Sequence, residues 1–289
     1  MEITWMSFIS KIPMVTGWLL KAQLINKMTT FEIAKRLKVF KRKEIQCSRP
    51  GNQRCRNIGN AIVTIDPSSA SSPYPSANGN AVQYFGCGAE VSQTDFLKIL
   101  NTMEESQIER FFFWVSPNPQ RDEIVTWLLD KGFKPFQGTQ YPTLIRPVEE
   151  VAPHGTNLRV ERVPSLEVEN RADAIRHIYN PWNCSFFFDS VNLSGFEHFL
   201  AYENHTPVSA AILGIHDDTA YLGWAATSEE HRGKGGQNAL IKARLNRAAE
   251  LGCQIACSET LTMLKTSLKI LERNGFEIIY EKQVFVWES

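Results

Sequence analysis

The sequence predicts an α/β (α+β) protein built from two tandem copies of one unit. The chain has 289 residues, which is room for about two domains of ordinary size. Apolar residues at helical spacing alternate with short runs that are typical of strands. A single offset places Gly132-Phe133 on Gly275-Phe276 and also places residues 110–115 on residues 253–258. Such a shared offset indicates an internal repeat.

The composition is that of an ordinary globular protein, with 43% hydrophobic and 21% charged residues. The 31 Lys and Arg balance the 31 Asp and Glu, so no global field would draw the chain to nucleic acid or to an anionic membrane. The six cysteines are dispersed without a C-x-x-C pair, which argues against a disulfide framework and a structural zinc site. We therefore expect no metal cofactor.

The most apolar stretch lies near the N-terminus, over residues 5–25. Lys11, Pro13 and Lys21 interrupt it, and its longest charge-free piece is about half the length that a bilayer span needs. It also lacks the basic start and cleavage site of a secretory signal. We predict a cytoplasmic protein without a membrane partner, and we interpret residues 1–27 as an N-terminal extension.

The first unit is expected over residues 28–148. Spacing and turn residues predict a helix over 28–45, strands over 61–66 and 81–86 around a surface loop over 67–79, a helix over 92–107, a strand over 110–115, a helix over 120–131, and a strand over 141–146 that closes the unit. A linker over 147–155 separates it from the next unit.

The helix over 28–45 carries six Lys and Arg residues between Lys35 and Lys43. They could grip the phosphates of a nucleic acid. We favour a solvated helix whose apolar stripe packs on a domain, because no aromatic or glycine-rich RNA signature accompanies the charges.

The second unit is expected over residues 156–289. The pattern predicts a strand over 158–163, a helix from Ser165 to Tyr179, a short helix over 194–197, strands over 208–215 and 220–227, a helix that begins at Gly235 and is terminated by Gly252, a strand over 253–258, a helix over 265–274 and a final strand over 277–287.

One segment of the second unit is suited to a pyrophosphate. The strand that ends at Thr227 is followed by Arg232-Gly233-Lys234-Gly235-Gly236 and then by a helix. Glycines allow the backbone N–H groups to approach a phosphate, the helix start adds partial positive charge, and the two cations add full charges. At the matching place the first unit has Ala89-Glu90-Val91-Ser92, so only the second unit is expected to hold phosphate.

The segment Thr227–Ala239 resembles the acetyl-CoA-binding motif of the GNAT N-acetyltransferases. The chain is most similar to bacterial tandem-GNAT proteins with a degenerate N-terminal copy, through Ala225-Ala226-Thr227, the loop that ends at Gln237, Gly252-Cys253 and Glu259-Thr260. The resemblance implies two tandem GNAT-like domains, each a mixed, largely antiparallel sheet flanked by helices, of which the domain over 156–289 is catalytic.

The resemblance also implies the substrate-binding roles. Backbone amides of Arg232, Gly233, Lys234, Gly235, Gly236 and Gln237 would take the CoA pyrophosphate. The strand edge at Ala225, Ala226 and Thr227 would pair with the pantetheine arm and would place an N–H beside the thioester oxygen. Acetyl-CoA is then the cosubstrate.

The tyrosine that many family members place four residues before Gly-Phe is Leu271 here, so another group must protonate the leaving thiolate. We predict catalytic roles for Glu259 as the base and Ser267 as the hydroxyl donor. The competing interpretations are that Glu259 caps the following helix and that Ser267 only allows close packing.

The acceptor is expected between the first two helices of the second unit. Tyr179, Trp182 and Phe187 could wall a pocket in which Asp189 holds an amine, or the aromatic run could simply fill core. The sequence therefore predicts an acetyl-CoA-dependent N-acetyltransferase acting on a small-molecule or peptide amine. A CoA-binding module without chemistry and a ribosome- or nucleic-acid-associated protein are the alternatives.

Overall fold

The computed structural model describes residues 28–47, 54–66, 79–87, 90–136, 140–153, 155–180 and 184–289. The predicted N-terminal extension over 1–27, nearly all of the predicted surface loop over 67–79, and Trp182 lie outside the described residues. None of the helices in the described part is long and apolar enough to cross a membrane.

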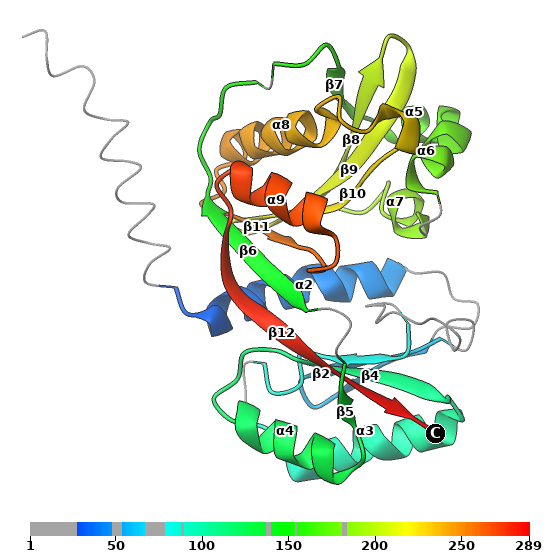
Figure 1. Ribbon diagram of the computed structural model, residues 1–289, viewed down its shortest axis with the longest axis vertical. Helices are drawn as coiled ribbons and strands as arrows, with labels where there is room; N and C mark the ends of the chain where they lie inside the picture. The colour runs from blue at the N-terminus through cyan, green and yellow to red at the C-terminus, as the bar shows by residue number, and fades with distance from the viewer. Residues whose placement is uncertain are drawn as a thin grey trace, which may run out of the picture.

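The first half forms the lower part of the molecule in Figure 1, with α3 and α4 on one side of its strands. Its elements are α2 (Thr30–Cys47), β1 (Arg54–Ile58), β2 (Ala61–Ile65), β3 (Ala81–Gln83), α3 (Gln93–Ser106), β4 (Arg110–Val115), α4 (Arg121–Asp130), β5 (Lys134–Pro135) and β6 (Tyr141–Pro147).

The second half forms the upper part, where α8 and α9 lie side by side. Its elements are β7 (Arg159–Val163), α5 (Ser165–Asn170), α6 (Ala172–Tyr179), α7 (Ser185–Asp189), β8 (Phe196–Glu203), β9 (Thr206–His216), β10 (Thr219–Thr227), the 3-10 turn η4 (Glu229–His231), α8 (Gly236–Glu250), β11 (Ile255–Glu259), α9 (Lys265–Arg273) and β12 (Glu277–Glu288).

The same strand-helix-strand unit occurs in both halves. In the first half, β3 and β4 pair in parallel around α3, and in the second half β10 and β11 pair in parallel around α8. The neighbouring pairs in both sheets are antiparallel. The predicted fold, two tandem units with mixed and largely antiparallel sheets flanked by helices, is confirmed.

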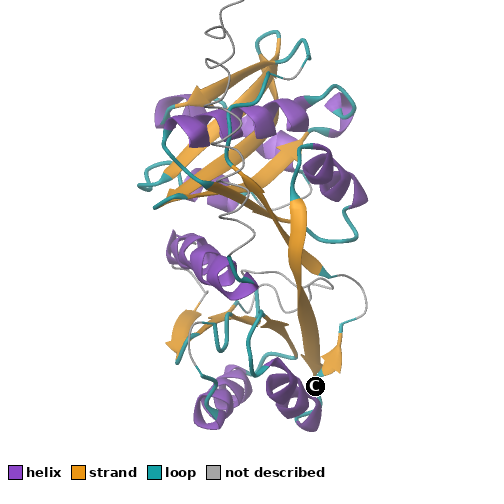
Figure 2. Cartoon of the chain, turned by 90° about the vertical axis from the view of Figure 1, so that its left-hand side faces the viewer, coloured by secondary structure: helices purple, strands orange, loops and turns teal. Residues whose placement is uncertain are grey.

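The two halves exchange their last strands. The strand β6, which we expected to close the first unit, lies between β11 and β12 in the sheet of the second half. In return, residues 283–288 at the end of β12 pair with β4 and β5 of the first half. Figure 2 shows the long β12 running from one half into the other. One continuous strand order, β1-β2-β3-β4-β12-β6-β11-β10-β9-β8-β7, therefore connects the molecule.

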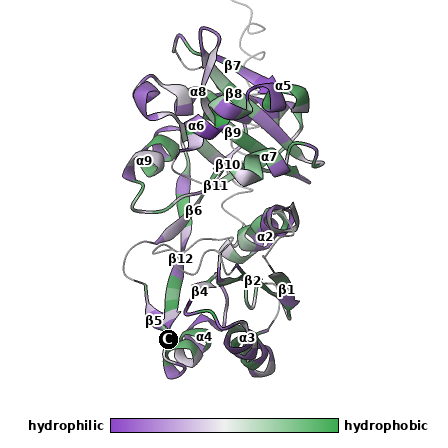
Figure 3. Cartoon of the chain, turned by 90° about the vertical axis from the view of Figure 1, so that its right-hand side faces the viewer, coloured by the Kyte–Doolittle hydropathy of each residue, from purple (hydrophilic) through white to green (hydrophobic). Residues whose placement is uncertain are grey.

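Helix α2 lies between the two halves and contacts both (Figure 3). Its residues Ile33, Leu37 and Phe40 are buried in the core of the second half. On another side of the helix, Ala34 packs with Ile62, Tyr84 and Cys87 of the first half. The apolar stripe read from the sequence thus joins two domains.

Several of the basic residues of α2 bind the protein itself. Arg36 pairs with Asp218 and donates 2.7 Å to the hydroxyl of Thr219. Lys38 is buried and donates to the carbonyl of Asn60. Lys41 pairs with Glu44, and the ammonium of Lys43 lies 5.8 Å from the ring centre of Phe196. The contacts of Arg36, Lys38 and Lys43 fix the helix in place, whereas the pair of Lys41 and Glu44 lies within the helix.

Some predicted elements differ from the structure. The short helix expected over 194–197 was wrong, because Phe196 begins β8 and pairs with Gly214 of β9. The helix expected from Ser165 to Tyr179 is broken at Arg171 into α5 and α6. Pairing across the sheet and packing against it override the local signals at these places.

Candidate acyl-CoA site

The strand β10 separates from β11 in the middle of the second sheet. Their parallel pairing runs only from Thr219–Ile255 to Tyr221–Cys257. Two residues later β10 contains a bulge, because its register against β9 shifts between Gly223 and Ala226. Trp224 lies within the bulge with a left-handed φ of 47°, a conformation that is strained for a bulky residue. The bulge leaves Ala225 exposed at the strand edge.

Four side chains from three elements bind the carbonyl groups along this part of β10. Ser258 donates 2.7 Å to Leu222 and Gln237 donates 2.8 Å to Ala226. At the bulge, Arg244 donates to Gly223 at 3.4 Å and Tyr179 donates to Trp224. These bonds therefore hold the strand in one conformation on the side where its pairing with β11 has ended.

The glycine-rich loop joins the end of β10 to the start of α8. Gly233 and Gly235 have φ of 82° and 86°, values that glycine adopts without strain. A Cβ on Gly236 would lie only 2.4 Å from the hydroxyl of Ser209, so a side chain there would push α8 away from β9. Gly235 is the N-cap of α8 and has no side chain with which to bind the first amides.

The matching helix start in the first half is closed by its own side chains. Ser92 is the N-cap of α3, and its hydroxyl accepts from the amide of Asp95 at 3.4 Å. The amide of Val91 donates 2.9 Å to Gln120. This supports the predicted asymmetry between the two loops, although Ala89 lies outside the described residues.

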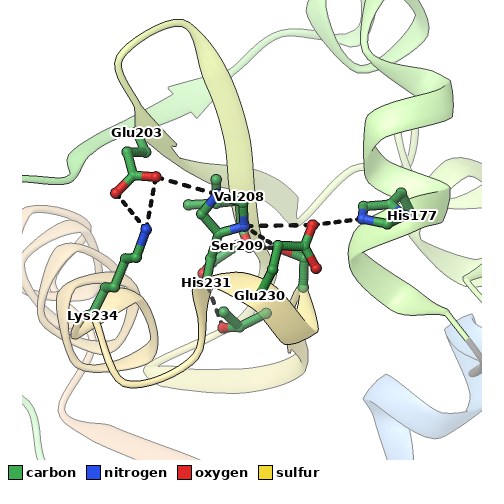
Figure 4. A network of polar contacts seen from close by, with 9 residues as sticks. His177, Glu203, Val208, Ser209, Glu230, His231 and Lys234 are labelled. Carbon is green, nitrogen blue, oxygen red and sulfur yellow. Dashed lines mark hydrogen bonds and ion pairs between the residues drawn. The ribbon is translucent and has the colours of Figure 1, made fainter.

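Acidic side chains surround the cations of the loop (Figure 4). Lys234 lies 2.7 Å and 2.9 Å from the two oxygens of Glu203, at the end of β8. His231 lies 3.2 Å from the same carboxylate, and Glu230 pairs with His177 at 2.7 Å. The hydrogen bond from Lys234 lowers the pKa of Glu203, so this carboxylate stays charged at neutral pH and competes with any phosphate for Lys234.

The two predicted catalytic residues lie at the end of β11 and at the start of α9. The carboxylate of Glu259 is buried, pairs with Lys282 at 2.6 Å, and accepts from the hydroxyl of Thr143 at 2.8 Å. The hydroxyl of Thr260 donates 3.1 Å to Ser267. Leu271, which replaces the family's tyrosine, is buried in the core.

The predicted acceptor residues are distributed over core and surface. Tyr179 and Phe187 are 5% and 1% exposed, and their rings lie 5.6 Å apart at an angle of 53° within the main core of the second half. Asp189 ends α7 and has one carboxylate oxygen buried. Phe187 therefore fills the core, as the alternative interpretation of the aromatic run expected. Tyr179 is also buried, but its hydroxyl contacts the candidate site by donating a hydrogen bond to the carbonyl of Trp224.

Sequence reasoning missed Arg244, Lys282 and Glu203. A signal existed for Arg244, since it occupies a position of the apolar stripe of its helix, four residues after Leu240. The other two could not be found, because their partners Glu259 and Lys234 lie on other elements.

The fold and the loop define a class of protein: an α/β domain with a separated central strand followed by a helix start that can bind phosphate. Residues 157–276 match the family model "Acetyltransferase (GNAT) family". This part of the chain is a GNAT acetyltransferase domain.

Solved structures support the tandem arrangement. A GCN5-related N-acetyltransferase from Kribbella flavida is 15% identical, with a TM-score of 0.61 over 89% of this chain and 95% of that one. One from Sphaerobacter thermophilus is 13% identical, with a TM-score of 0.56 over 79% and 80%. A tandem GNAT protein from the clavulanic acid biosynthesis pathway is 11% identical, with a TM-score of 0.55 over 79% and 78%. The comparison with curated proteins gave no match.

Proposed function

We propose that the protein is an acetyl-CoA-dependent N-acetyltransferase whose catalytic part lies within residues 156–289, with residues 28–148 as a scaffold that does not bind CoA. The observation that carries this proposal is the bulged strand edge of β10 leading into an uncapped, glycine-lined helix start. The residues fit the pyrophosphate of CoA, since Arg232 and Lys234 are half exposed beside left-handed glycines at the N-terminus of α8.

In this proposal the amides of Arg232 to Gln237 bind the pyrophosphate, and Ala225 to Thr227 pair with the pantetheine arm. The bound cosubstrate supplies a thioester carbonyl carbon as the electrophile. The acceptor amine attacks that carbon directly, the carbon–sulfur bond breaks, and the proton lost by the nitrogen is balanced by the proton gained by the thiolate. The products are an acetamide and free CoA.

The roles of Glu259 and Ser267 remain part of the proposal. Glu259 would accept the amine proton, which requires the carboxylate to give up part of its bonding to Lys282. Ser267 would donate its proton to the thiolate and regain one from solvent, while Thr260 donates a hydrogen bond to its oxygen.

A second candidate is a CoA-binding module without chemistry. The buried Leu271 and the buried ion pair of Glu259 both favour it, because they remove a hydroxyl and engage a carboxylate where a transferase needs an acid and a base.

Calorimetry with CoA and a free-thiol release assay with acetyl-CoA and a panel of amines test both candidates. We expect one CoA site per chain and thiol release with at least one amine. Gly235→Glu should abolish CoA binding, because a carboxylate there blocks and repels the pyrophosphate. The matched control is Gly252→Glu at the other end of α8, which has a similar positive φ and open surroundings.

Two CoA sites would contradict the scaffold role of the first half. Equal CoA binding by Gly235→Glu and Gly252→Glu would remove the loop from the proposal. CoA binding without thiol release across the panel would establish the second candidate.

A further inference from the structure

Arg244 is a buried cation beneath the bulge of β10. Its side chain is 1% exposed, and within the described residues no carboxylate pairs with it. Its guanidinium instead donates to three backbone carbonyls: Leu240 at 3.1 Å, Ile212 at 3.0 Å and Gly223 at 3.4 Å. Burying an unpaired charge is costly, so a leucine or methionine would serve packing better at this place.

The bonds of Arg244 join the two strands where their register shifts. Ile212 and Gly223 are the last regular pair of β9 and β10 before the bulge. From the opposite face of the sheet, the hydroxyl of Tyr179 binds the carbonyl of Trp224 inside the bulge. The strained backbone of Trp224 is thus held between a residue of α8 and a residue of α6.

We propose that Arg244 is a positioning residue for acyl transfer: it fixes the bulge of β10 and keeps a positive field beneath the strand edge that receives the thioester carbonyl. This inference rests on the proposed function, since it assigns acetyl-CoA to that edge. Burial lowers the pKa of Arg244 to about 9, which still leaves the guanidinium charged at neutral pH.

The role follows from electrostatics. When an amine attacks a thioester, negative charge develops on the carbonyl oxygen. A fixed positive charge in a region of low dielectric stabilises that charge without reorganisation. The carbonyls that hold Arg244 are only partial charges, so its field is not cancelled as it would be by a carboxylate. The same field polarises the thioester carbonyl before any reaction.

Infrared spectroscopy of carbonyl-labelled ¹³C acetyl-CoA bound to the full chain measures this polarisation without an acceptor amine. The variants are Arg244→Met and Arg244→Lys, with Arg247→Met as the matched control on the next turn of α8, where the arginine pairs with Glu197. Amide hydrogen exchange of residues 223–226 in the free proteins reports the bulge itself.

We expect the wild-type carbonyl band to lie below that of acetyl-CoA in water. Arg244→Met should lose at least half of this shift, with exchange in the bulge at least tenfold faster and CoA affinity within threefold of wild type. Arg244→Lys should retain much of the shift, because it keeps the charge, but should lose bulge protection. Arg247→Met should change neither readout.

An unchanged band in Arg244→Met would overturn the inference while leaving the proposed function intact. If that variant does not fold, Arg244→Lys decides: bulge exchange as slow as in wild type would overturn the inference. Absence of acetyl-CoA binding by the wild-type chain would overturn the proposed function and the inference with it.

Discussion

The ammonium of Lys282 lies 2.6 Å from the carboxylate of Glu259, with the two side chains 2% and 6% exposed. Lys282 stands where β12 leaves the pairing with β6 and begins the pairing with β4. The rings of Tyr84, Trp114 and Tyr141 surround its ammonium at 5.1 to 5.6 Å. Burial, together with the negative charge of Glu259, raises the pKa of Tyr84, so this tyrosine remains neutral. A buried ion pair of the second half is therefore enclosed by aromatic rings of the first half.

Breaking this pair from one side should destabilise the protein strongly. Glu259→Gln leaves the charge of Lys282 buried without a partner, which costs about 3–5 kcal/mol in comparable cases. The double variant Glu259→Gln with Lys282→Met should recover most of that loss. Urea denaturation of Glu259→Gln, Lys282→Met and the double variant measures the free energy of unfolding of each. A loss below about 1 kcal/mol in Glu259→Gln would contradict the buried pair.

The same double variant separates stability from catalysis. If Glu259 is the base, the folded double variant should bind CoA normally but turn over an accepted amine about 100-fold more slowly at neutral pH. The loss should shrink at high pH, where the amine deprotonates unaided. Turnover equal to wild type would leave Glu259 with the structural role alone.

Removing Glu203 should strengthen CoA binding. Glu203→Gln frees Lys234 and keeps the shape of the side chain, so we expect the affinity for CoA to rise about two- to fivefold, in the range of an exposed ion pair. Glu230→Gln is the matched control, since Glu230 pairs with His177 rather than with Lys234. Titration calorimetry at low salt would show the effect best. Weaker binding by Glu203→Gln would mean that Glu203 orients the lysine for the phosphate.

The buried His198 should make the protein sensitive to mild acid. Burial lowers its pKa from 6.5 to about 4, and its ring nitrogen lies 3.0 Å from the hydroxyl of Ser190. Between these two pH values the unfolded chain binds a proton that the folded chain does not. Stability therefore falls as the pH drops from 6.5 towards 4, by about 3 kcal/mol from this residue.

The control for that prediction is His198→Gln, which keeps a hydrogen-bonding group near Ser190 and does not titrate. The urea midpoints at pH 7.5 and pH 5 should differ less for the variant than for the wild type. Equal pH dependence of the two proteins would show that other groups cause the acid sensitivity.

Local signals in the sequence were sufficient to predict the glycine-rich turn before α8. The glycines at 235, 252 and 275 mark a helix start, a helix end and a turn, and each acts through its own backbone conformation. The repeat of these signals in the first half was sufficient for the tandem fold. The left-handed φ of Gly235 explains why so short a motif is informative.

Non-local pairing was not predictable in the same way. An alternating run such as Tyr141–Pro147 specifies a strand but not the sheet that it joins. The exchange of β6 and β12 brings Lys282 and Thr143 to Glu259, so the surroundings of the predicted base depend on a topology that no local pattern encodes. The bulge at Trp224 depends likewise on Arg244 and Tyr179, which lie on two helices.

The strand exchange predicts that the halves cannot be separated. Residues 156–289 alone would lack β6 between β11 and β12 and would leave residues 283–288 without β4, and an unpaired strand edge promotes aggregation. Residues 28–150 alone would carry β6 without a sheet to join. We expect each fragment to be insoluble when expressed alone, and the two to co-purify when expressed together with an affinity tag on one of them. The matched control repeats the co-expression with Phe285→Asp in the 156–289 fragment. This buried residue pairs with Phe113 of β4, so a carboxylate there should abolish co-purification. A soluble, monomeric 156–289 fragment with a cooperative thermal transition would contradict the exchange.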